Sequence, residues 1–221
     1  MLGALSQIYG MYFTKNNNFI TNNNISMINT GPAGYGYGIY LTGSSNNTIQ
    51  NNIANNNYGI NDGFGIYLQS SSNNNTITNN TANSNQYGLY LTGSSNNNLT
   101  NNNIWNCTDT TYGCIYFSSS QNNTITGGLI NLSAGNLIYL DTNSNNNIFK
   151  DLTLLGASKN DTFLTATSIN NTFLNVSYNN SVGKEYVASG SQLIRKWYYR
   201  AYVNDTSGTA VSSANVTAYN V

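Results

Sequence analysis

The sequence contains no histidine, and its three methionines, Met1, Met11 and Met27, do not cluster. Copper is held by soft thiolate and thioether ligands and by imidazole, so we expect no copper site. Charge is also scarce, because seven Lys and Arg residues balance seven Asp and Glu residues and only 6% of the chain is charged. Binding to nucleic acid depends on clustered positive charge, so no nucleic-acid partner is expected.

Long apolar runs are absent as well. No run approaches the ~18 residues that cross a bilayer, and we therefore expect no membrane span. The opening residues, MLGALSQIYGMYF, lack the basic start and the cleavage site of a signal peptide. Repeat-like sequence follows almost at once, so we expect that Met1 is not the natural start and that an export signal precedes it.

Asparagine is abundant, at roughly a fifth of all residues, and Ser and Thr supply about another fifth. Such a composition alone is typical of a disordered tract. Against disorder, apolar residues return in phase every 22 to 29 positions, which is typical of repeat architectures. The unit is clearest in GLYLTGSSNNNLTNNN, from Gly88 to Asn103, with near copies beginning at Gly38 and Gly65.

Two markers keep the same register along the chain. The aromatic residues of the first strand fall at Tyr12, Tyr40, Tyr67, Tyr90, Tyr116, Tyr139, Phe163 and Tyr186. The apolar residues of the second strand fall at Ile20, Ile49, Ile77, Leu99, Ile125, Ile148, Phe173 and Ile194. A third strand is marked by Ile25, Ile53, Ile104 and the stretches 129–132, 152–155 and 174–176. The pattern predicts stacked coils of three short strands, each hydrogen-bonded to the coils above and below.

Alternation within the first strand predicts which side chains face inward. Ile39 and Leu41 point to one face and Tyr40 to the other, and later units repeat this arrangement. We expect the aliphatic residues to fill the interior and the tyrosines to form an exposed aromatic stripe. Asn suits the corners because it tolerates the left-handed backbone conformation and because stacked amides bond along the axis.

The repeated unit GIYLTGSSNNTI, with its Asn corners, resembles the parallel β-helix repeat family, in particular the Asn-rich right-handed β-helices of archaeal cell-surface proteins. The resemblance implies an all-β, right-handed parallel β-helix (solenoid) of about seven to eight coils, which we place at residues 1–198. Residues 199–221 resemble the opening strand pair of an immunoglobulin-like module, and these strands fold either within the chain or against a neighbouring subunit. The family includes polysaccharide-cleaving enzymes, copper-handling proteins and non-catalytic surface proteins, so the resemblance alone specifies no activity.

Extra residues collect at one corner of the coils. Insertions before Tyr40, Tyr67 and Tyr116 predict a lobe that carries aromatic residues together with Asp62 and Asp109. The third insertion contains both cysteines of the chain. For these we expect either a Cys107–Cys114 disulfide or two small buried thiols.

Cleavage of polysaccharide requires carboxylates close together on an exposed strand face. The weak candidates are Asp141, Asp151 and Asp161. Asp62 and Asp109 lie two coils apart, or roughly 10 Å at the spacing of β-strands. We expect all of these to be solvated charges, with no catalytic residue. The repeat GGxGxDxUx of calcium-binding β-rolls is absent, and we expect neither a metal nor a cofactor.

The leading hypothesis is a non-catalytic extracellular protein, a segment of a surface layer, sheath, filament or adhesin that assembles end to end with copies of itself. The first alternative is a carbohydrate-binding β-helix, and the second is a polysaccharide lyase or hydrolase. Contacts to glycan or to a neighbouring subunit would then come from the stripe and the corner loops, at Tyr12, Tyr40, Tyr67, Tyr90, Tyr116, Tyr139, Tyr58 and Tyr112.

Fourteen Asn-x-Ser/Thr sequons permit N-glycosylation of an exported protein, although chance alone gives roughly ten at this composition. They begin at Asn24, Asn46, Asn74, Asn79, Asn98, Asn106, Asn122, Asn131, Asn160, Asn170, Asn175, Asn179, Asn204 and Asn215.

Overall fold

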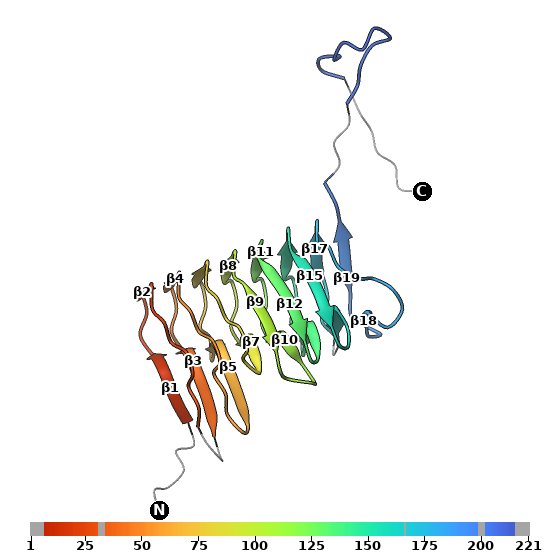
Figure 1. Cartoon of the computed structure of the whole chain (residues 1–221). Helices are drawn as coiled ribbons and strands as arrows, with labels where there is room; N and C mark the ends of the chain where they lie inside the picture. The colour runs from red at the N-terminus through yellow and green to blue at the C-terminus, as the bar shows by residue number, and fades with distance from the viewer. Residues whose placement is uncertain (1–6, 31–33, 166, 199–201, 215–221) are drawn as a thin grey trace, which may run out of the picture.

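A computed structural model describes residues 7–30, 34–165, 167–198 and 202–214 (Figure 1). Within these ranges, nineteen strands form three parallel sheets. Sheet 1 contains β1 (Gln7–Phe13), β3 (Tyr35–Thr42), β5 (Asp62–Gln69), β7 (Tyr87–Thr92), β10 (Gly113–Ser118), β13 (Asn136–Asp141), β16 (Thr162–Leu164) and β18 (Glu185–Val187). Sheet 2 contains β2 (Phe19–Thr21), β4 (Thr48–Gln50), β6 (Thr76–Thr78), β8 (Asn98–Thr100), β11 (Thr124–Thr126), β14 (Ile148–Lys150), β17 (Asn171–Leu174) and β19 (Leu193–Lys196).

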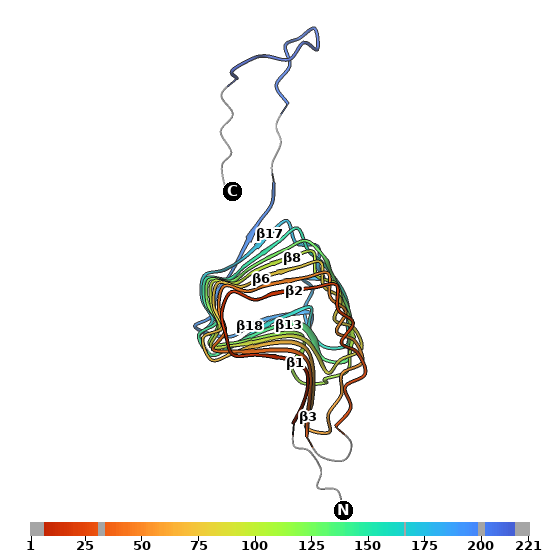
Figure 2. The same cartoon turned by 90° about the vertical axis from the view of Figure 1, so that its left-hand side faces the viewer.

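The chain winds through sheet 1 and then sheet 2 in each of eight coils. The end-on view shows that the two sheets lie on opposite sides of the coils (Figure 2). This confirms the predicted all-β solenoid. Sheet 3 has only three strands, β9 (Ile104–Cys107), β12 (Leu129–Ser133) and β15 (Thr153–Ala157). In earlier coils the third side is reduced to single bridges such as Ile53 with Thr81. The predicted third side is thus present, with regular strands in the middle of the molecule and isolated bridges in earlier coils.

Aliphatic side chains fill the interior in ladders, as alternation predicts. Ile39 and Leu41 are fully buried, and they pair with Ile66 and Leu68 in the next coil. The second-strand ladder differs from the prediction at two places. Phe149 pairs with Ile125 and is fully buried, whereas Ile148 is 40% exposed. In the last coil Ile194 pairs with Thr172, and Phe173 pairs with Arg195. Side chains alternate with a period of two, so an error of one residue reverses the face.

The third side shows the same kind of one-residue shift. Ile53 is 40% exposed, and the interior position is held by Ala54, as it is by Ala82 in the following coil. The predicted third-strand stretch 174–176 is also divided, since Leu174 ends β17 of sheet 2 while Val176 is buried.

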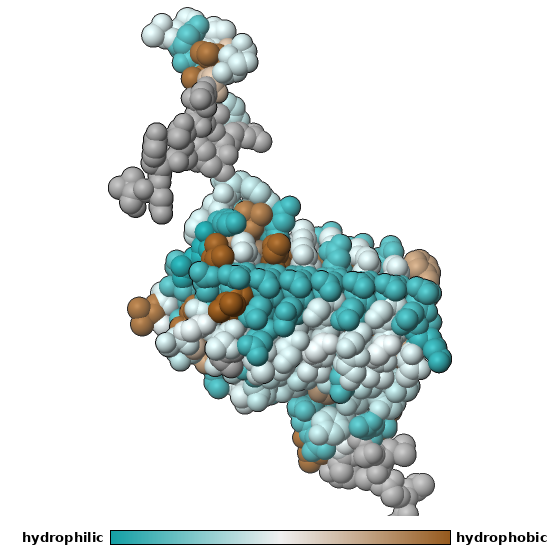
Figure 3. Space-filling view, turned by 180° about the vertical axis from the view of Figure 1, so that it is seen from behind, coloured by the Kyte–Doolittle hydropathy of each residue, from teal (hydrophilic) through white to brown (hydrophobic). Residues whose placement is uncertain are grey.

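Asn side chains hold the corners together. Asn75 and Asn97 are buried, and the Asn75 amide donates from Nδ2 to Oδ1 of Asn97 at 3.0 Å, while Asn97 donates in turn to Asn123 at 3.0 Å. Neighbouring exposed residues such as Asn96 adopt positive φ, here 59°. This corner forms a continuous hydrophilic stripe along the solenoid (Figure 3).

The C-terminal segment 202–214 contains one antiparallel bridge, between Asn204 and Ala210, and the turn between them is closed by a bond from Gly208 N–H to Asp205 C=O at 3.0 Å. The rest of the predicted strand pair, residues 199–201 and 215–221, lies outside the described residues. Across the described ranges, no helix has the length and apolar character needed to cross a bilayer.

Candidate functional site

The tyrosines of sheet 1 stack on one another along the axis. Ring centroids are 5.1 Å apart between Tyr40 and Tyr67, 4.7 Å between Tyr67 and Tyr90, and 4.6 Å between Tyr90 and Tyr116. Three of these rings are buried, because a second aromatic row packs beside them. That row contains Tyr9, Tyr37, Phe64, Tyr87 and Tyr112. The prediction of an exposed stripe is therefore wrong for the middle of the solenoid.

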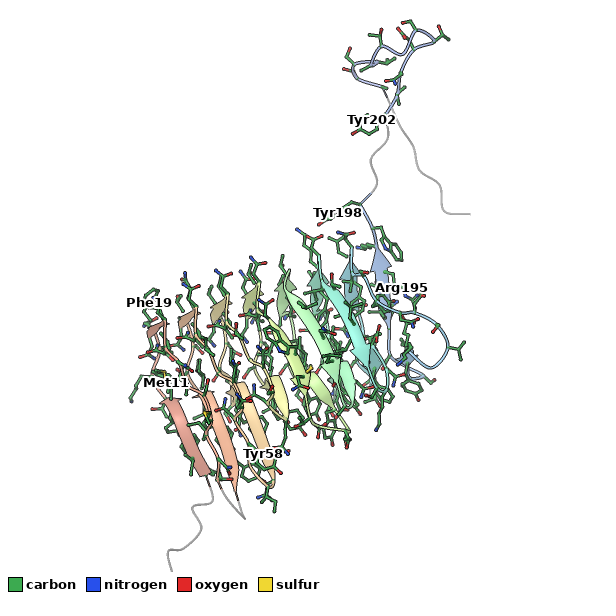
Figure 4. The ribbon with its side chains drawn as sticks, in the orientation of Figure 1. Met11, Phe19, Tyr58, Arg195, Tyr198 and Tyr202 are labelled. Atoms are coloured by element: carbon green, nitrogen blue, oxygen red, sulfur yellow. A yellow bond between two sulfur atoms is a disulfide. The ribbon has the colours of Figure 1, made fainter. Side chains whose placement is uncertain are left out.

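The stacking of the rings determines which ring faces are free to contact a ligand. The planes of Tyr67 and Tyr90 are 11° apart, so each ring face covers the next. Sugars stack on ring faces, which are free only where a ladder ends or a ring stands alone. Tyr12 at the first coil is 50% exposed, and so is Tyr58, which projects from the corner before β5 (Figure 4). Tyr112 is half-buried, and Tyr139 stands at 90° to Tyr116.

The second aromatic row exists because the inserted residues lengthen the strands of sheet 1 at their start. In β5, Phe64 precedes Gly65, Ile66 and Tyr67, and the same aromatic-Gly-aliphatic-Tyr order begins at Tyr87 in the next coil. Glycine is required between the two aromatics, since a Cβ atom at Gly65 would lie 2.7 Å from the carbonyl oxygen of Gly88. The second aromatic row is therefore predictable from this motif in the sequence.

Two carboxyl groups lie beside the hydroxyl of Tyr87. Asp62 is the first residue of β5, and Asp109 belongs to the loop between β9 and β10. The Tyr87 hydroxyl donates to Oδ2 of Asp109 at 3.2 Å, and Asp62 lies close enough to both groups for them to affect its pKa. Both acids are half-buried, so the prediction that they are solvated charges is wrong. Tyr87, which lies beside both, was missed because its position is explained by packing alone.

The loop that carries Asp109 is closed by a disulfide between Cys107 and Cys114, whose Cα atoms are 5.2 Å apart. Within it, Oδ1 of Asp109 accepts backbone N–H groups from Thr111 at 2.9 Å and Gly113 at 3.1 Å, and also from Tyr112. Backbone donors of this kind stabilise a carboxylate. The disulfide and the turn thus fix the position of Asp109 relative to Tyr87.

Asp62 is the acid of the pair whose protonation differs from that of a free side chain. Burial raises the pKa of Asp62 to about 6, and the negative charge of Asp109 adds to the rise, while the nearby Tyr87 hydroxyl opposes it. Burial also raises the pKa of Tyr87, and both carboxylates reinforce this, so its hydroxyl keeps its proton. The Tyr87 hydroxyl thus lies beside one carboxyl group with a raised pKa and a second that accepts backbone N–H groups.

The predicted acidic candidates of the later coils are not brought together. Asp141 ends β13 and accepts the Tyr116 hydroxyl at 3.2 Å. Asp151 is exposed at the corner after β14, where Lys150 lies 4.0 Å away. Asp161 precedes β16 and is 3% exposed, with one oxygen accepting the backbone N–H of Asn179 at 2.7 Å. Asp161 is therefore a buried acid and not a solvated one.

A cavity of about 460 Å³ opens beside Asp161, between β15 and the loop that precedes β18. Lys184 lines it and donates from Nζ to the carbonyl oxygens of Ala157 at 2.6 Å and Lys159 at 3.0 Å. Lys184 thus covers the end of sheet 3. Nearby, Arg195 pairs with Glu185 across the last coil. In the part of the chain that the structure describes, no three Cys, Asp or Glu side chains gather as a metal site requires.

The sequons lie mainly on the exterior. Most of their Asn side chains are exposed, Asn131 and Asn160 are half-buried, and Asn215 lies outside the described residues. Glycosylation of these sites stays a prediction.

A model of the right-handed β-helix region family matches residues 9–195. Among solved structures, the periplasmic alginate epimerase AlgG is similar to the chain, with a TM-score of 0.64 at 16% identity, over 86% of this chain and 48% of AlgG. The chain thus spans about half the length of AlgG. A candidate glycosyl hydrolase from Parabacteroides merdae gives a TM-score of 0.47 at 12% identity, over 67% of this chain and 84% of its own. Among curated proteins, none matches the sequence. The likeness to AlgG shows a shared fold.

Proposed function

Because the chain belongs to the right-handed β-helix family, we propose that it cleaves a polysaccharide at the corner formed by Asp62, Tyr87 and Asp109. The observation that carries the proposal is the pair of carboxyl groups beside one phenol hydroxyl, one of them with its pKa raised to about 6. Carbohydrate as the substrate class is supported by the likeness to AlgG, an alginate epimerase. Polysaccharide cleavage, the second alternative that the sequence raised, thus replaces the non-catalytic rod as the leading hypothesis.

The geometry assigns one role to each acid. Protonated Asp62 donates its proton to the bridging oxygen of a glycosidic bond, and Asp109 accepts a proton from water. The oxygen of that water bonds to the sugar carbon as the bond to the bridging oxygen breaks. A reaction of this inverting kind needs the two carboxyl groups about 6.5–9.5 Å apart, so that the water fits between them and the sugar.

Activity on a panel of polysaccharides that includes alginate tests the proposal, with new reducing ends and loss of chain length as readouts. We expect cleavage that declines above pH 6, and a loss of at least about 100-fold in Asp62→Asn and Asp109→Asn, because proton transfer is removed. Asp141→Asn is the matched control, since Asp141 also accepts a tyrosine hydroxyl at 3.2 Å but lies outside the corner of Asp62, Tyr87 and Asp109. An equal loss in this control, or no cleavage by the wild type, would contradict the proposal.

An exported location follows from the same proposal. The Cys107–Cys114 disulfide is of the kind that persists in oxidising compartments. AlgG, which shares the fold, is periplasmic. We propose an extracellular or cell-surface location, and cell fractionation with an antibody against the protein tests it.

A second candidate function is the end-to-end rod. Within the described residues, β1 and β2 each pair with a single neighbour, so the first coil presents open strand edges. Such edges pair with other strands when they are left uncovered. Electron microscopy of the native material distinguishes the two: filaments favour the rod, and particles of a single small size exclude it.

A further inference from the structure

The outward face of sheet 2 carries a regular array of threonines. In β4, β6, β8 and β11, the middle residue is buried and the two flanking residues point outward. Of these eight outward positions, Gln50 and Asn98 hold amides. The other six are Thr48, Thr76, Thr78, Thr100, Thr124 and Thr126.

The threonines lie in register along the axis. Thr48 pairs with Thr76 in one row, and Thr78 pairs with Thr100, which pairs with Thr126, in the other. From β2 to β11, no outward position of sheet 2 is charged, and the first charge is Lys150 of β14. Strand propensity alone does not account for this choice, because tyrosine and valine form strands as readily and sheet 1 uses tyrosine outside.

The array is rigid. Threonine is branched at Cβ, which restricts its χ1 angle and holds hydroxyl and methyl in a fixed orientation. The strands are also framed by a buried amide ladder on each side. On one side the Asn75 side chain bonds to Asn97 at 3.0 Å, and on the other Asn80 bonds to Asn102 at 3.0 Å. Neighbouring coils therefore cannot slide past each other.

The spacing of the threonines along the axis is close to the distance between second-neighbour oxygens in a lattice of water. Adjacent strands lie about 4.8 Å apart. In a tetrahedral network of O–H···O bonds of about 2.8 Å, second-neighbour oxygens lie about 4.5 Å apart. Hydroxyls on successive coils can therefore stand in for successive lattice oxygens over several repeats, while the threonine methyls cover the spaces between them.

We propose that the threonine face of sheet 2 binds ice. An uncharged array of small hydroxyls is complementary to an uncharged crystal of water, whereas a charged partner would find nothing to pair with. A crystalline polysaccharide would be bound through a row of flat aromatic faces. β4, β6, β8 and β11 carry no aromatic residue, and the exposed Phe19 of β2 is a single ring at the end of the face. This inference is independent of the acidic corner, which lies on sheet 1.

The test measures how fluorescently labelled protein partitions into a slowly growing ice hemisphere, together with the rate of ice recrystallisation. We expect the wild type to enter the ice and to slow recrystallisation. The double variant Thr78→Lys, Thr100→Lys places two long charged side chains in the middle of one row, and we expect at least a tenfold loss of both effects.

Thr153→Lys is the matched control, because Thr153 is also a half-buried strand threonine but lies in sheet 3. It should behave as the wild type does. Circular dichroism establishes that each variant is folded, and Thr100→Ser provides a milder change if the double variant fails to fold. Exclusion of the wild type from ice, equal partitioning of the folded double variant, or adsorption to crystalline chitin or cellulose in place of ice would overturn the proposal.

Discussion

At the scale of single residues, Asp62 combines a functional role with a cost to stability. Its pKa is raised from 3.8 to about 6 in the folded protein, chiefly by burial. Between these two values the folded state binds more protons than the unfolded state does, so the free energy of unfolding falls as the pH rises through this window. Below it Asp62 is protonated in both states and the penalty disappears.

Asp62→Asn removes this titration. We expect the variant to be more stable than the wild type at pH 7 by about 1 kcal/mol, a figure reduced to allow for solvent screening of a half-buried group. The difference should shrink to near zero at pH 4. Thermal melting followed by circular dichroism between pH 4 and pH 8 measures it. A difference in melting temperature that stays constant across this range would show that burial of the charge is not its cause.

At the scale of elements, adjacent asparagines at the corner between sheet 1 and sheet 2 differ in role: one is buried and hydrogen-bonded, and the next is exposed. Asn97 accepts both the backbone N–H of Asn75, at 2.8 Å, and its side-chain amide, so Asn97→Ala leaves buried donors without a partner. We expect a loss of about 2–3 kcal/mol in the free energy of unfolding. Asn96 is exposed with positive φ, and Asn96→Gly should change stability by less than about 0.5 kcal/mol. Urea denaturation compares them, and equal losses would refute the ladder's energetic role.

Much of the element architecture could be read from the sequence, because alternation around Tyr40 and the Asn corners follows from local rules. The errors arose where corner lengths vary. Ile148 and Phe149 are both apolar, and only the pairing of Phe149 with Ile125 identifies which one points inward. The acidic corner was harder to foresee, since Asp62 and Asp109 are distant in sequence. Their meeting at Tyr87 depends on how an inserted strand extension and a disulfide-closed loop stack.

At the scale of the whole molecule, each coil contacts only its two neighbours, so a complete coil is removable. Deletion of residues 125–148 joins Thr124 to Phe149, which takes the place of Ile125 in the ladder. We expect a folded protein with a single, lower melting transition and an intact acidic corner. Deletion of 125–147 differs by one residue, turns Ile148 inward and Phe149 to solvent, and should cost about 3 kcal/mol more. Calorimetry of both deletions checks this, and equal stability would contradict the assigned register.

The serial arrangement of the coils also determines how the molecule responds to tension. Neighbouring coils are joined by bonds between residues 22 to 29 positions apart. A force applied at the two ends of the chain acts on the hydrogen bonds of one coil at a time, beginning with a terminal coil. Each rupture releases roughly 75 to 100 Å of chain, at about 3.5 Å per residue. The solenoid should therefore lengthen in steps under tension and dissipate mechanical work at every step.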